Sequence, residues 1–272
     1  LVRLLERLDP RRWSCQVISL IGDGPAADQL GELKIPVTTI GMTRGLPGPL
    51  SLSRLGSRVR AARPDLVQTW LYHSDLLGGL ATRLARPGVP VVWNLRMNGP
   101  TRGRDKVSTC WTARACALLS RRLPARIVVN SQAGRDVHRA LGYDAGRLEV
   151  IPNGFDTERF CPSPAARLAL RQELGVPGST PLIGMAARWD PLKDFETVLA
   201  AAAVLMQRQP DLHVVLCGAG VDRDNTALTE LADETGCGER LHLMGRRTDM
   251  PGWQAALDVA LLASHTEGFP NT

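Results

Sequence analysis

Two cations stand out because they follow a short apolar run that is typical of a buried strand. Arg188 and Lys193 lie in the stretch MAARWDPLKDF, on either side of an Asp-Pro turn and just before a helical pattern. Cations beside a helix N-terminus favour an anion, because the backbone N–H groups and the side chains then point the same way. The spacing predicts a diphosphate site. The alternative is a pair of solvated loop cations, with Lys193 paired to Asp194 or Glu196.

A carboxylate holds a similar place further along the chain. Glu267 lies in the stretch ASHTEGFPN, which follows another apolar run. Carboxylates accept hydrogen bonds from sugar hydroxyls well, so this position predicts contact with a polyhydroxylated ligand. The alternative is a Gly-Pro turn that carries a surface glutamate.

Glycines and acids follow a third apolar run, in the stretch CGAGVDRD. Gly218 and Gly220 would let the backbone approach a ligand or simply turn the chain, and no third glycine follows at the spacing of a nicotinamide site. Asp222 and Asp224 match a DxD metal pattern, but acids just before a helix are ordinary caps. The six cysteines show no zinc-like spacing and are interpreted as free thiols in a reducing cytosol. We expect no metal and no cofactor.

The elements that would position these residues are strands and helices that alternate along the chain. Short β-branched runs are separated by amphipathic stretches such as 52–63, 74–86 and 193–209. Near-continuous apolar strands separated by helices are typical of a parallel sheet that is covered on both faces. The predicted strands cover residues 15–21, 37–42, 65–72, 89–96, 125–131 and 148–153, and then 181–188, 212–220, 240–245 and 258–264.

Two such series predict an α/β protein with two Rossmann-like domains. An Asn-Gly pair at Asn153 marks the break, and Ser163 can cap a helix that begins at Pro164. The predicted N-terminal domain covers residues 1–160 and the C-terminal domain residues 161–272. Because open parallel sheets bind ligands beyond the carboxyl ends of their strands, we expect the two sheets to face each other across a cleft.

Charge is distributed unevenly along the chain. Residues 1–150 hold 23 Lys and Arg against 11 Asp and Glu, whereas residues 151–272 hold 10 against 16. A basic half favours an anionic partner such as a membrane surface, a lipid phosphate or nucleic acid, and the alternative is an arginine-rich surface without a partner. Residues 101–123 are amphipathic and basic, which suits either a lipid surface or an ordinary surface helix. No apolar run approaches the roughly 18 residues that span a bilayer.

In this order, the stretches resemble glycosyltransferase family 4, the retaining GT-B enzymes. The segment between the two domains of the family is matched by VIPNGFDTERF, and its phosphate-binding segment by ARWDPLKDFETVLAA. The family's nucleotide-binding and sugar-binding segment is matched by LMGRRTDMPGWQAALDVALLASHTEGFPN. The acceptor domain of polysaccharide-building members is matched by DLVQTWLYHSDLLGGLATRLA, VVWNLR and ARIVVNSQAGRDVHRALGY. The resemblance covers essentially the whole chain and implies the GT-B fold.

The resemblance also implies roles for individual residues. Arg188 and Lys193 would hold the donor diphosphate, and Glu267 would touch the transferred sugar. Backbone groups around Met244–Arg247 would meet the base, and N–H groups of Gly268 and Phe269 would lie near the sugar or phosphate. The expected donor-binding residues are thus Gly218, Gly220, Met244, Arg246, Arg247, Gly268 and Phe269.

One departure from the family concerns a histidine. Many relatives place it after the strand matched by VVWNLR, where it is held to contact the sugar, but this chain has Arg96 and Met97 there. His73 ends another predicted strand and, with Arg96 and Asn153, is a candidate for the lining of the cleft. The alternative for His73 is a histidine of the helix start or of the core.

A second departure concerns the two ends. A first strand with a Gly-rich turn is expected before Leu1, and a second glutamate, which would hold the ribose, is expected beyond Thr272. We therefore expect a gene fragment whose second domain is incomplete and whose second sheet has an unfinished edge.

The resemblance predicts a metal-independent, retaining hexosyl transfer from a nucleoside-diphosphate sugar to a hydroxyl acceptor. The acceptor would be lipid-linked or a growing cell-surface polysaccharide, and no nucleic acid partner is expected. The protein would be cytoplasmic and peripheral at the inner face of the cell membrane. One alternative is a non-catalytic paralogue that binds nucleotide-sugars, which the missing histidine favours and the residues Arg188, Lys193 and Glu267 oppose. The other is a GT-B sugar-nucleotide epimerase, which would need cleft acids and a histidine.

Overall fold

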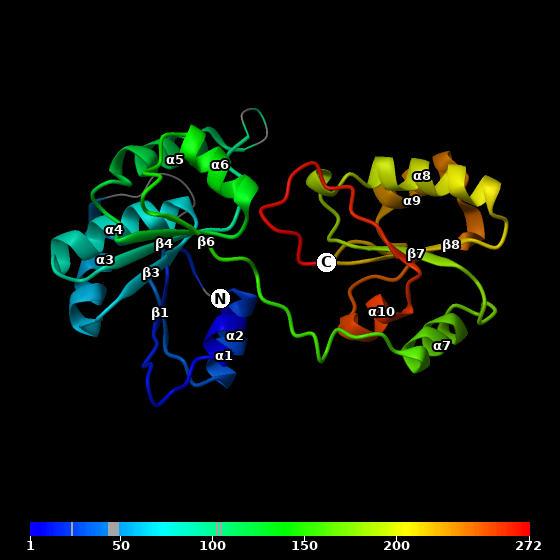
Figure 1. The fold of residues 1–272 in the computed structure, drawn as a ribbon, viewed down its shortest axis with the longest axis horizontal. Coiled ribbons are helices and arrows are strands. Elements are labelled where there is room, and N and C mark those ends of the chain that lie inside the picture. The colour runs from blue at the N-terminus through cyan, green and yellow to red at the C-terminus, as the bar shows by residue number, and fades with distance from the viewer. Residues whose placement is uncertain (23, 43–48, 102, 104) are drawn as a thin grey trace. The chain divides into compact units, whose positions relative to one another are not determined.

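The computed structural model describes residues 1–22, 24–42, 49–101, 103 and 105–272. Contacts divide the chain into two compact units, Leu1–Pro152, here unit 1, and Asn153–Thr272, here unit 2. Each unit holds parallel strands covered by helices (Figure 1). The predicted α/β class with parallel sheets is therefore confirmed.

The division between the units falls before the predicted boundary at residue 160. Residues 153–160 form no strand and no helix. Their side chains contact the end of unit 2, because the Asn153 amide donates to Asn271 Oδ1 at 2.8 Å and the Phe155 ring centroid lies 6.0 Å from that of Phe269. Proline and helix-cap signals mark where the next helix begins, whereas the contacts assign the preceding loop to unit 2.

Unit 1 holds two parallel sheets, one of two strands in the order β1-β2 and one of four in the order β3-β4-β5-β6. Helices α4, α5 and α6 lie over one face of the four-stranded sheet (Figure 1). The bounds of the elements are α1 Val2–Glu6, β1 Val17–Ser19, α2 Pro25–Glu32, β2 Val37–Thr39, α3 Pro49–Ala62, β3 Val67–Trp70, α4 Tyr72–Ala85, β4 Val91–Leu95, α5 Val107–Leu119, β5 Arg126–Val129, α6 Gln132–Ala140 and β6 Leu148–Val150.

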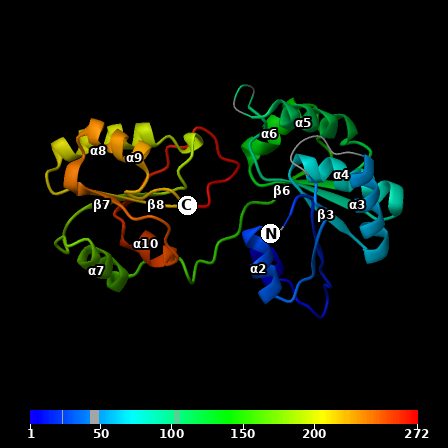
Figure 2. The ribbon, with the colours of Figure 1, turned by 180° about the vertical axis from the view of Figure 1, so that it is seen from behind.

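Unit 2 holds one parallel sheet in the order β10-β7-β8-β9. Helices α8 and α9 cover one face, and α7 and α10 cover the other (Figure 2). The bounds of the elements are α7 Pro164–Glu173, β7 Leu182–Ala186, the 3-10 helix η1 Pro191–Lys193, α8 Phe195–Arg208, β8 His213–Cys217, α9 Thr226–Thr235, the 3-10 helix η2 Gly238–Arg240, β9 Leu241–Leu243, α10 Met250–Ala256 and β10 Val259–Ala260.

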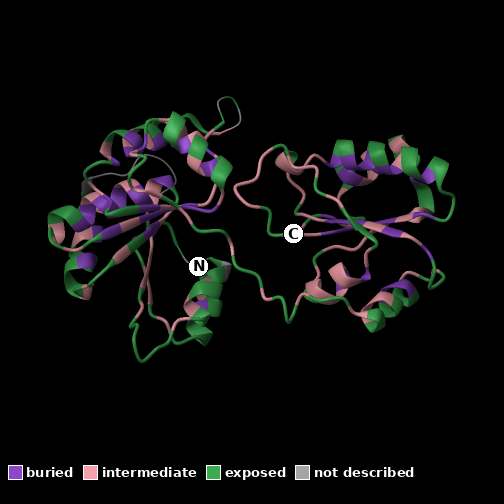
Figure 3. Cartoon of the chain, in the orientation of Figure 1, coloured by how far each residue is buried: buried purple, intermediate pink, exposed green. Residues whose placement is uncertain are grey.

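The central strand β8 explains the continuous apolar run of unit 2. Val214 and Leu216 belong to the core under α8 and α9, whereas Val215 and Cys217 belong to the core under α7 and α10. Both faces of the strand are therefore buried, which is typical of a parallel sheet between two helix layers. Figure 3 shows the same pattern, with buried residues on the strands and exposed residues on the outer sides of the helices.

Two glycines bring α4 close to the sheet of unit 1. A Cβ atom at Gly78 would lie 2.6 Å from Thr69 Cγ2, and one at Gly79 would lie 3.2 Å from the indole nitrogen of Trp93. Larger residues would push the helix away from the strands, because interiors are close-packed. The sequence LLGGL thus fixes the distance between α4 and strands β3 and β4.

Candidate functional site

The predicted cation and carboxylate of unit 2 meet beyond the carboxyl ends of β7 and β10. Lys193 lies in η1, and its Nζ is 2.5 Å from Glu267 Oε1. Both side chains are largely buried, with 18% and 23% of their surface exposed. Lys193 therefore has a partner far along the chain, which the short-range alternatives Glu196 and Asp194 did not include. The fold brings together two residues that lie 74 positions apart.

Arg188 follows β7 and is paired within its own turn. Its Nε and Nη2 donate to Asp190 Oδ2 at 3.0 and 2.6 Å, and the side chain is mostly exposed. Asp190 begins η1 by accepting the Leu192 N–H at 2.9 Å. That backbone bond, followed by the Arg188 guanidinium, holds the pKa of Asp190 below its usual range. An incoming anion would therefore compete with a carboxylate for Arg188.

A short network fixes the segment after β10 against η1. The backbone N–H of His265 donates to the Leu192 carbonyl at 3.0 Å, and its Nδ1 lies 3.7 Å from Asp194 Oδ2. Asp194 has a left-handed φ of 52° and caps α8 by accepting the Thr197 N–H at 3.2 Å. These contacts hold the segment that carries Glu267 against η1, where Lys193 lies. Sequence reasoning missed His265, although it lies just before the carboxylate in the same phrase.

The two predicted glycines after β8 allow two backbone segments to touch. Gly218 has a φ of +151°, and a Cβ atom there would lie 1.9 Å from the Ala187 carbonyl oxygen. Gly220 has a φ of +72°, and a Cβ atom there would lie 3.2 Å from Trp189 Cβ. The glycines thus let the exit of β8 lie directly against the segment that carries Arg188. Their contribution to donor binding remains a prediction.

The predicted base-binding stretch holds two arginines in different settings. Arg247 donates to Glu173 at 2.6 and 3.1 Å and to Asp249 at 2.8 and 2.6 Å. These two acids, Asp249 first, raise the pKa of Arg247. Arg247 thereby links α7 to the start of α10, and Met244 packs in the core beside it. Arg246 is exposed and makes no ion pair with any residue that the structure describes.

The remaining predicted residues of unit 2 lie near its two ends. Gly268 and Phe269 follow Glu267 and are half-buried, with the Phe269 ring against Phe155. The Asn153 amide nitrogen donates to Asn271, whereas Asn153 Oδ1 is buried and has no hydrogen-bond partner among the described residues. The place of Asn153 in a cleft remains a prediction.

In unit 1, Arg96 directly follows β4 and stacks on an aromatic ring. Its guanidinium carbon lies 5.0 Å from the centroid of Trp70, the last residue of β3. Partial burial lowers the pKa of Arg96. The turn after Trp70 is strained, because Leu71 has φ 71° and ψ 158°, a conformation that glycine normally occupies. Helix α4 begins immediately after this turn.

Among the described residues of unit 1, His138 is a buried histidine, whereas His73 is half-buried at the start of α4, and its place in the lining of a cleft stays a prediction. His138 Nδ1 lies 2.6 Å from the Gly134 carbonyl, which can only accept. Nε2 is therefore the acceptor for the Tyr72 hydroxyl at 2.6 Å. Burial lowers the pKa of His138 and raises that of Tyr72. The pair holds α4 to α6.

A buried carboxylate, Asp75, was not predicted from the sequence. It is fully buried, and its Oδ1 accepts the Thr69 hydroxyl at 2.5 Å while Oδ2 has no partner among the described residues. Burial raises the pKa of Asp75 to about 7, against the opposing hydrogen bonds from Thr69 and the Asn94 backbone. The available signal was an acid that directly precedes the apolar run LLGGLA of α4.

Within the residues that the structure describes, no group of three or more His, Cys, Asp or Glu side chains is placed to hold a metal ion. All six cysteines are free thiols, and three of them are buried. The described residues at the strand ends of unit 2 offer cations and carboxylates. Such a set suits an anionic ligand that also carries hydroxyl groups.

Comparisons with known sequences agree with this arrangement. Residues 1–159 match Glycosyltransferase Family 4, and residues 166–272 match Glycosyl transferases group 1. A D-inositol 3-phosphate glycosyltransferase of Salinispora tropica is 31% identical over 82% of this chain and 51% of that protein. Its namesake from Salinispora arenicola is 30% identical over 82% of this chain and 55% of that protein. The chain thus spans about half the length of these curated relatives.

Solved structures show the same architecture. Anabaena HepE in complex with UDP-glucose is 26% identical with a TM-score of 0.76, and the match covers 96% of this chain and 69% of that chain. A sucrose-phosphate synthase from Thermosynechococcus elongatus, at 18% identity and a TM-score of 0.68, covers 94% of this chain and 77% of its own. At 18% identity, the similarity to the sucrose-phosphate synthase supports the fold alone.

Proposed function

The chain belongs to Glycosyltransferase Family 4, and on that premise we propose that the protein transfers a hexose from a nucleoside-diphosphate sugar to a hydroxyl acceptor. The observation that carries this proposal is the Lys193–Glu267 pair, 2.5 Å apart beyond the strand ends, with Arg188 after β7. A cation for the diphosphate and an acid for the sugar hydroxyls then lie at one edge. HepE, which was solved with UDP-glucose, supports a nucleotide-sugar as the donor.

In the proposed reaction, the bond between the anomeric carbon and the diphosphate oxygen breaks, and a bond from the acceptor oxygen to the same carbon forms. The leaving diphosphate keeps the electron pair, and Arg188 and Lys193 stabilise its charge where it develops. We propose that the acceptor attacks from the face of the leaving group, with retention of configuration. The acceptor proton then passes to the leaving phosphate, so that the proposal requires no metal.

For the acceptor, we propose a lipid-linked or growing cell-surface polysaccharide. The basic first half of the chain supports an acceptor with an anionic group, because it holds 23 Lys and Arg against 11 Asp and Glu over residues 1–150. A polyol phosphate is a second candidate. It is favoured by the two Salinispora relatives, whose names specify an inositol phosphate.

Peripheral contact with an anionic membrane is also part of the proposal, and α5 supports it. Val107, Trp111 and Leu118 lie on one side of this helix and are 72%, 64% and 82% exposed. The guanidinium carbon of Arg114 lies 5.6 Å from the Trp111 ring. An apolar stripe with aromatic and cationic members suits the boundary between headgroups and acyl chains.

The rest of the predicted basic stretch adds little to this argument. Arg102 and Arg104 lie outside the residues that the structure describes. Among the described helices, none is both long enough and apolar enough to cross a bilayer. The membrane proposal concerns contact at the surface.

Vesicle flotation tests the membrane surface. Vesicles of phosphatidylcholine with phosphatidylglycerol should carry the protein upward, and a Trp111→Ser, Leu118→Ser variant should float at least several-fold less. A matched control replaces Leu84, which is exposed on α4, by serine. Equal flotation of the α5 variant and the control would contradict the proposal. A change of oligomeric state in the α5 variant alone would indicate that a second copy covers this stripe instead.

Donor binding and transfer test the main proposal. Titration calorimetry with UDP-glucose should show binding that Lys193→Ala weakens by about tenfold or more, because a charge-assisted bond to phosphate is lost. Arg208→Ala, an exposed cation on α8, serves as the control. Glu267→Gln should reduce transfer of labelled sugar to an acceptor more than it reduces binding of UDP alone.

The outcomes separate the alternative functions. Equal UDP-glucose affinity in the wild type and in Lys193→Ala would remove the diphosphate assignment. Lys193-dependent binding without transfer to any acceptor would favour the non-catalytic paralogue. Conversion of the UDP-sugar into its epimer, without transfer, would favour the epimerase.

A further inference from the structure

Arg96 differs from the paired cations at the strand ends of unit 2. Arg188, Lys193 and Arg247 each have a carboxylate oxygen at 2.5 or 2.6 Å. Arg96 is half-buried against Trp70, and no acid among the described residues pairs with it. A cation that has lost part of its hydration and has no counter-ion favours the arrival of an anion. The lowered pKa of Arg96, whose cause is burial alone, agrees with this.

A polar side chain near Arg96 is also unsatisfied. Asn94 lies in β4, two residues before Arg96, which directly follows that strand. Asn94 is 3% exposed, and its Oδ1 has no hydrogen-bond partner among the described residues. Asn94 is in register with Trp70 on β3. A buried amide oxygen without a partner is costly, and a ligand hydroxyl would satisfy it.

The backbone next to this group is held in a strained turn. Leu71 follows Trp70, and its N–H donates to the Asn94 carbonyl at 3.1 Å despite the left-handed φ of 71°. Strain of this kind persists where the surrounding structure fixes it, and it is frequent at ligand sites. Helix α4 then begins without a side-chain cap, so its first N–H groups have no side-chain acceptor. The stacked arginine, the amide and the uncapped turn therefore come together at one strand edge.

We propose that Arg96, stacked on Trp70, binds an anionic phosphate group of the acceptor, while Asn94 accepts a hydroxyl of the same molecule. The identity of the ligand as the acceptor rests on the proposed function, whereas the anion site itself does not. The guanidinium fork suits a phosphate oxygen pair, and the indole ring holds its plane. The phosphate belongs either to a small polyol phosphate or to a lipid-linked phosphate.

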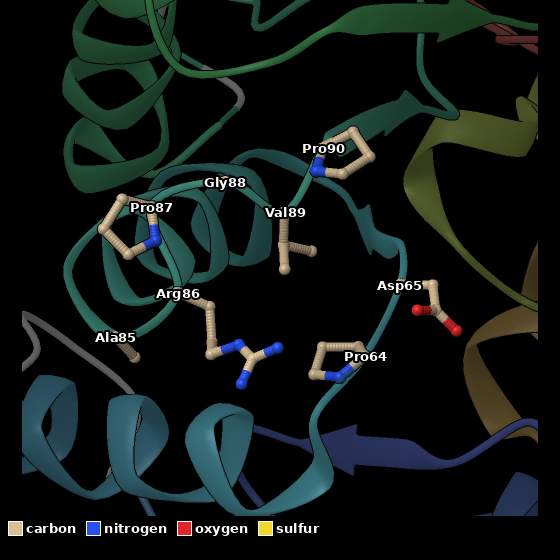
Figure 4. Close-up of a pocket in the computed structure, with 8 residues that line it drawn as sticks. All are labelled: Pro64, Asp65, Ala85, Arg86, Pro87, Gly88, Val89 and Pro90. Carbon is tan, nitrogen blue, oxygen red and sulfur yellow. The ribbon is translucent and has the colours of Figure 1, made fainter.

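A second half-buried arginine of unit 1 provides the matched control. Arg86 lines a hollow of about 380 Å³ at the amino ends of β3 and β4, the edge opposite to Arg96 (Figure 4). Asp65 lines the same hollow. The residues that line this hollow include no aromatic ring and no side-chain amide, so Arg86 has neither of the features that carry the proposal at Arg96. Arg86→Gln removes the same charge from the same unit without touching the proposed site.

The experiment is a calorimetric titration of the protein with sorbitol 6-phosphate, in the presence of saturating UDP so that the cations of unit 2 are occupied. Sorbitol is the neutral control. Arg96→Gln should weaken binding of the phosphate ester by tenfold or more, whereas Arg86→Gln should leave it unchanged. Arg96→Lys should recover only part of the loss, because lysine lacks the planar fork. UDP affinity should be the same in all variants, which checks that they are folded.

A second arm identifies the source of the phosphate. Flotation with phosphatidylcholine vesicles that contain a polyprenyl phosphate should depend on Arg96 if the acceptor is lipid-linked, and the soluble ester should show the dependence if it is a polyol phosphate. Loss of neither interaction in Arg96→Gln would overturn the proposal, as would an equal loss in Arg86→Gln.

The two proposals fail in different measurements. If Arg96-dependent phosphate binding is found but no sugar is transferred, the anion site stands and the transferase function falls. If UDP-glucose binding depends on Lys193 but Arg96→Gln changes no anion binding, the donor assignment stands and this inference falls.

Discussion

The carboxyl edges of the two sheets handle charge in opposite ways. In unit 2, the two cations beyond the end of β7 are each neutralised by an acid of the same unit, Lys193 by Glu267 and Arg188 by Asp190. In unit 1, Arg96 has an aromatic ring and no acid among the described residues, while the nearby Asp75 is buried with only neutral hydrogen-bond donors. These cations of unit 2 are thus paired with acids before a ligand binds, whereas Arg96 of unit 1 is not.

This difference has a physical consequence for ligands. A ligand of unit 2 must take cations away from carboxylates, so its net gain is reduced but the cations are held in place before it arrives. A ligand of unit 1 meets a cation that is already partly desolvated, and so gains more from the first contact. Cations that are already paired therefore favour precise positioning of a ligand, whereas an unpaired cation favours tighter binding of an anion.

The buried charges of the two units differ in the same sense. Arg171 in unit 2 is 1% exposed, and its guanidinium donates to the carbonyls of Thr180 and Ala256 and to Asp258. Asp75 in unit 1 is fully buried but leaves one oxygen without a partner among the described residues. A fully satisfied charge stabilises the fold, whereas a partly satisfied one titrates near neutral pH.

The largest effect is expected where the paired edge depends on close backbone contact. Gly218→Ala places a Cβ atom 1.9 Å from the Ala187 carbonyl oxygen. We expect a loss of about 3 kcal/mol or more in the free energy of unfolding of unit 2, together with lost UDP binding. Chemical denaturation measures the first and calorimetry the second. Gly236→Ala is the control, because Gly236 also has a positive φ but has open space around it.

Arg171→Met tests the satisfied buried charge. It removes one of the two arginine partners of Asp258 and the donor to three carbonyls, and should cost about 3 kcal/mol in the free energy of unfolding. Denaturation of the variant is compared with Arg208→Met, which changes an exposed arginine on α8. A loss as small as that of the control would show that Arg171 is not structural and would weaken the contrast with Asp75.

Asp75 tests the unsatisfied charge through pH. Its folded pKa of about 7 lies above the value near 3.9 of an unfolded aspartate, so the folded state holds the proton more tightly. Its contribution to stability is therefore fully present below about pH 4 and is lost as pH rises through 7. Unit 1 should lose about 2 kcal/mol between pH 5 and pH 7 from this group.

Asp75→Asn should abolish that slope, and Asp65→Asn, at an exposed aspartate of the same unit, should retain it. Denaturation midpoints at several pH values measure both variants. If stability falls with pH as steeply in Asp75→Asn as in the wild type, another group titrates. The contrast between Arg171 and Asp75 would then not hold.

The smallest effect concerns the ion pair itself. A double-mutant cycle of Lys193→Ala and Glu267→Ala should give a coupling of about 1 kcal/mol in the free protein, because the pair is only partly exposed. With UDP bound, the coupling should fall, since the diphosphate shares the lysine. A coupling that UDP does not change would indicate that Lys193 is not released to the donor.

Local features of the fold were predictable from the sequence. Ser163 caps α7 by accepting the Ala166 N–H at 3.2 Å, as the phrase before Pro164 predicts. The apolar runs became strands, and their alternation with helices indicated parallel sheets. These signals depend on neighbours within a few residues, where the periods of 2 and 3.6 and the geometry of caps act.

The resemblance to a known family added roles that no local pattern carries. Local patterns singled out Arg188, Lys193 and Glu267, the resemblance gave them roles toward the diphosphate and the transferred sugar, and two of these three meet in the structure. The resemblance offered no reason to expect that Arg247 would be held by Glu173 and Asp249. A role implied by resemblance specifies a position, whereas the strength of the interaction depends on what else is there.

By itself, the sequence determined the elements, their order and the residue types at each strand end. Only the tertiary structure decided which charges are paired, because the sheet order β10-β7-β8-β9 differs from the order along the chain. It placed Glu267 beside a lysine 74 residues away and left Arg96 with a ring in place of an acid. Electrostatic energy depends on distance through space and on burial, and a one-dimensional pattern contains neither.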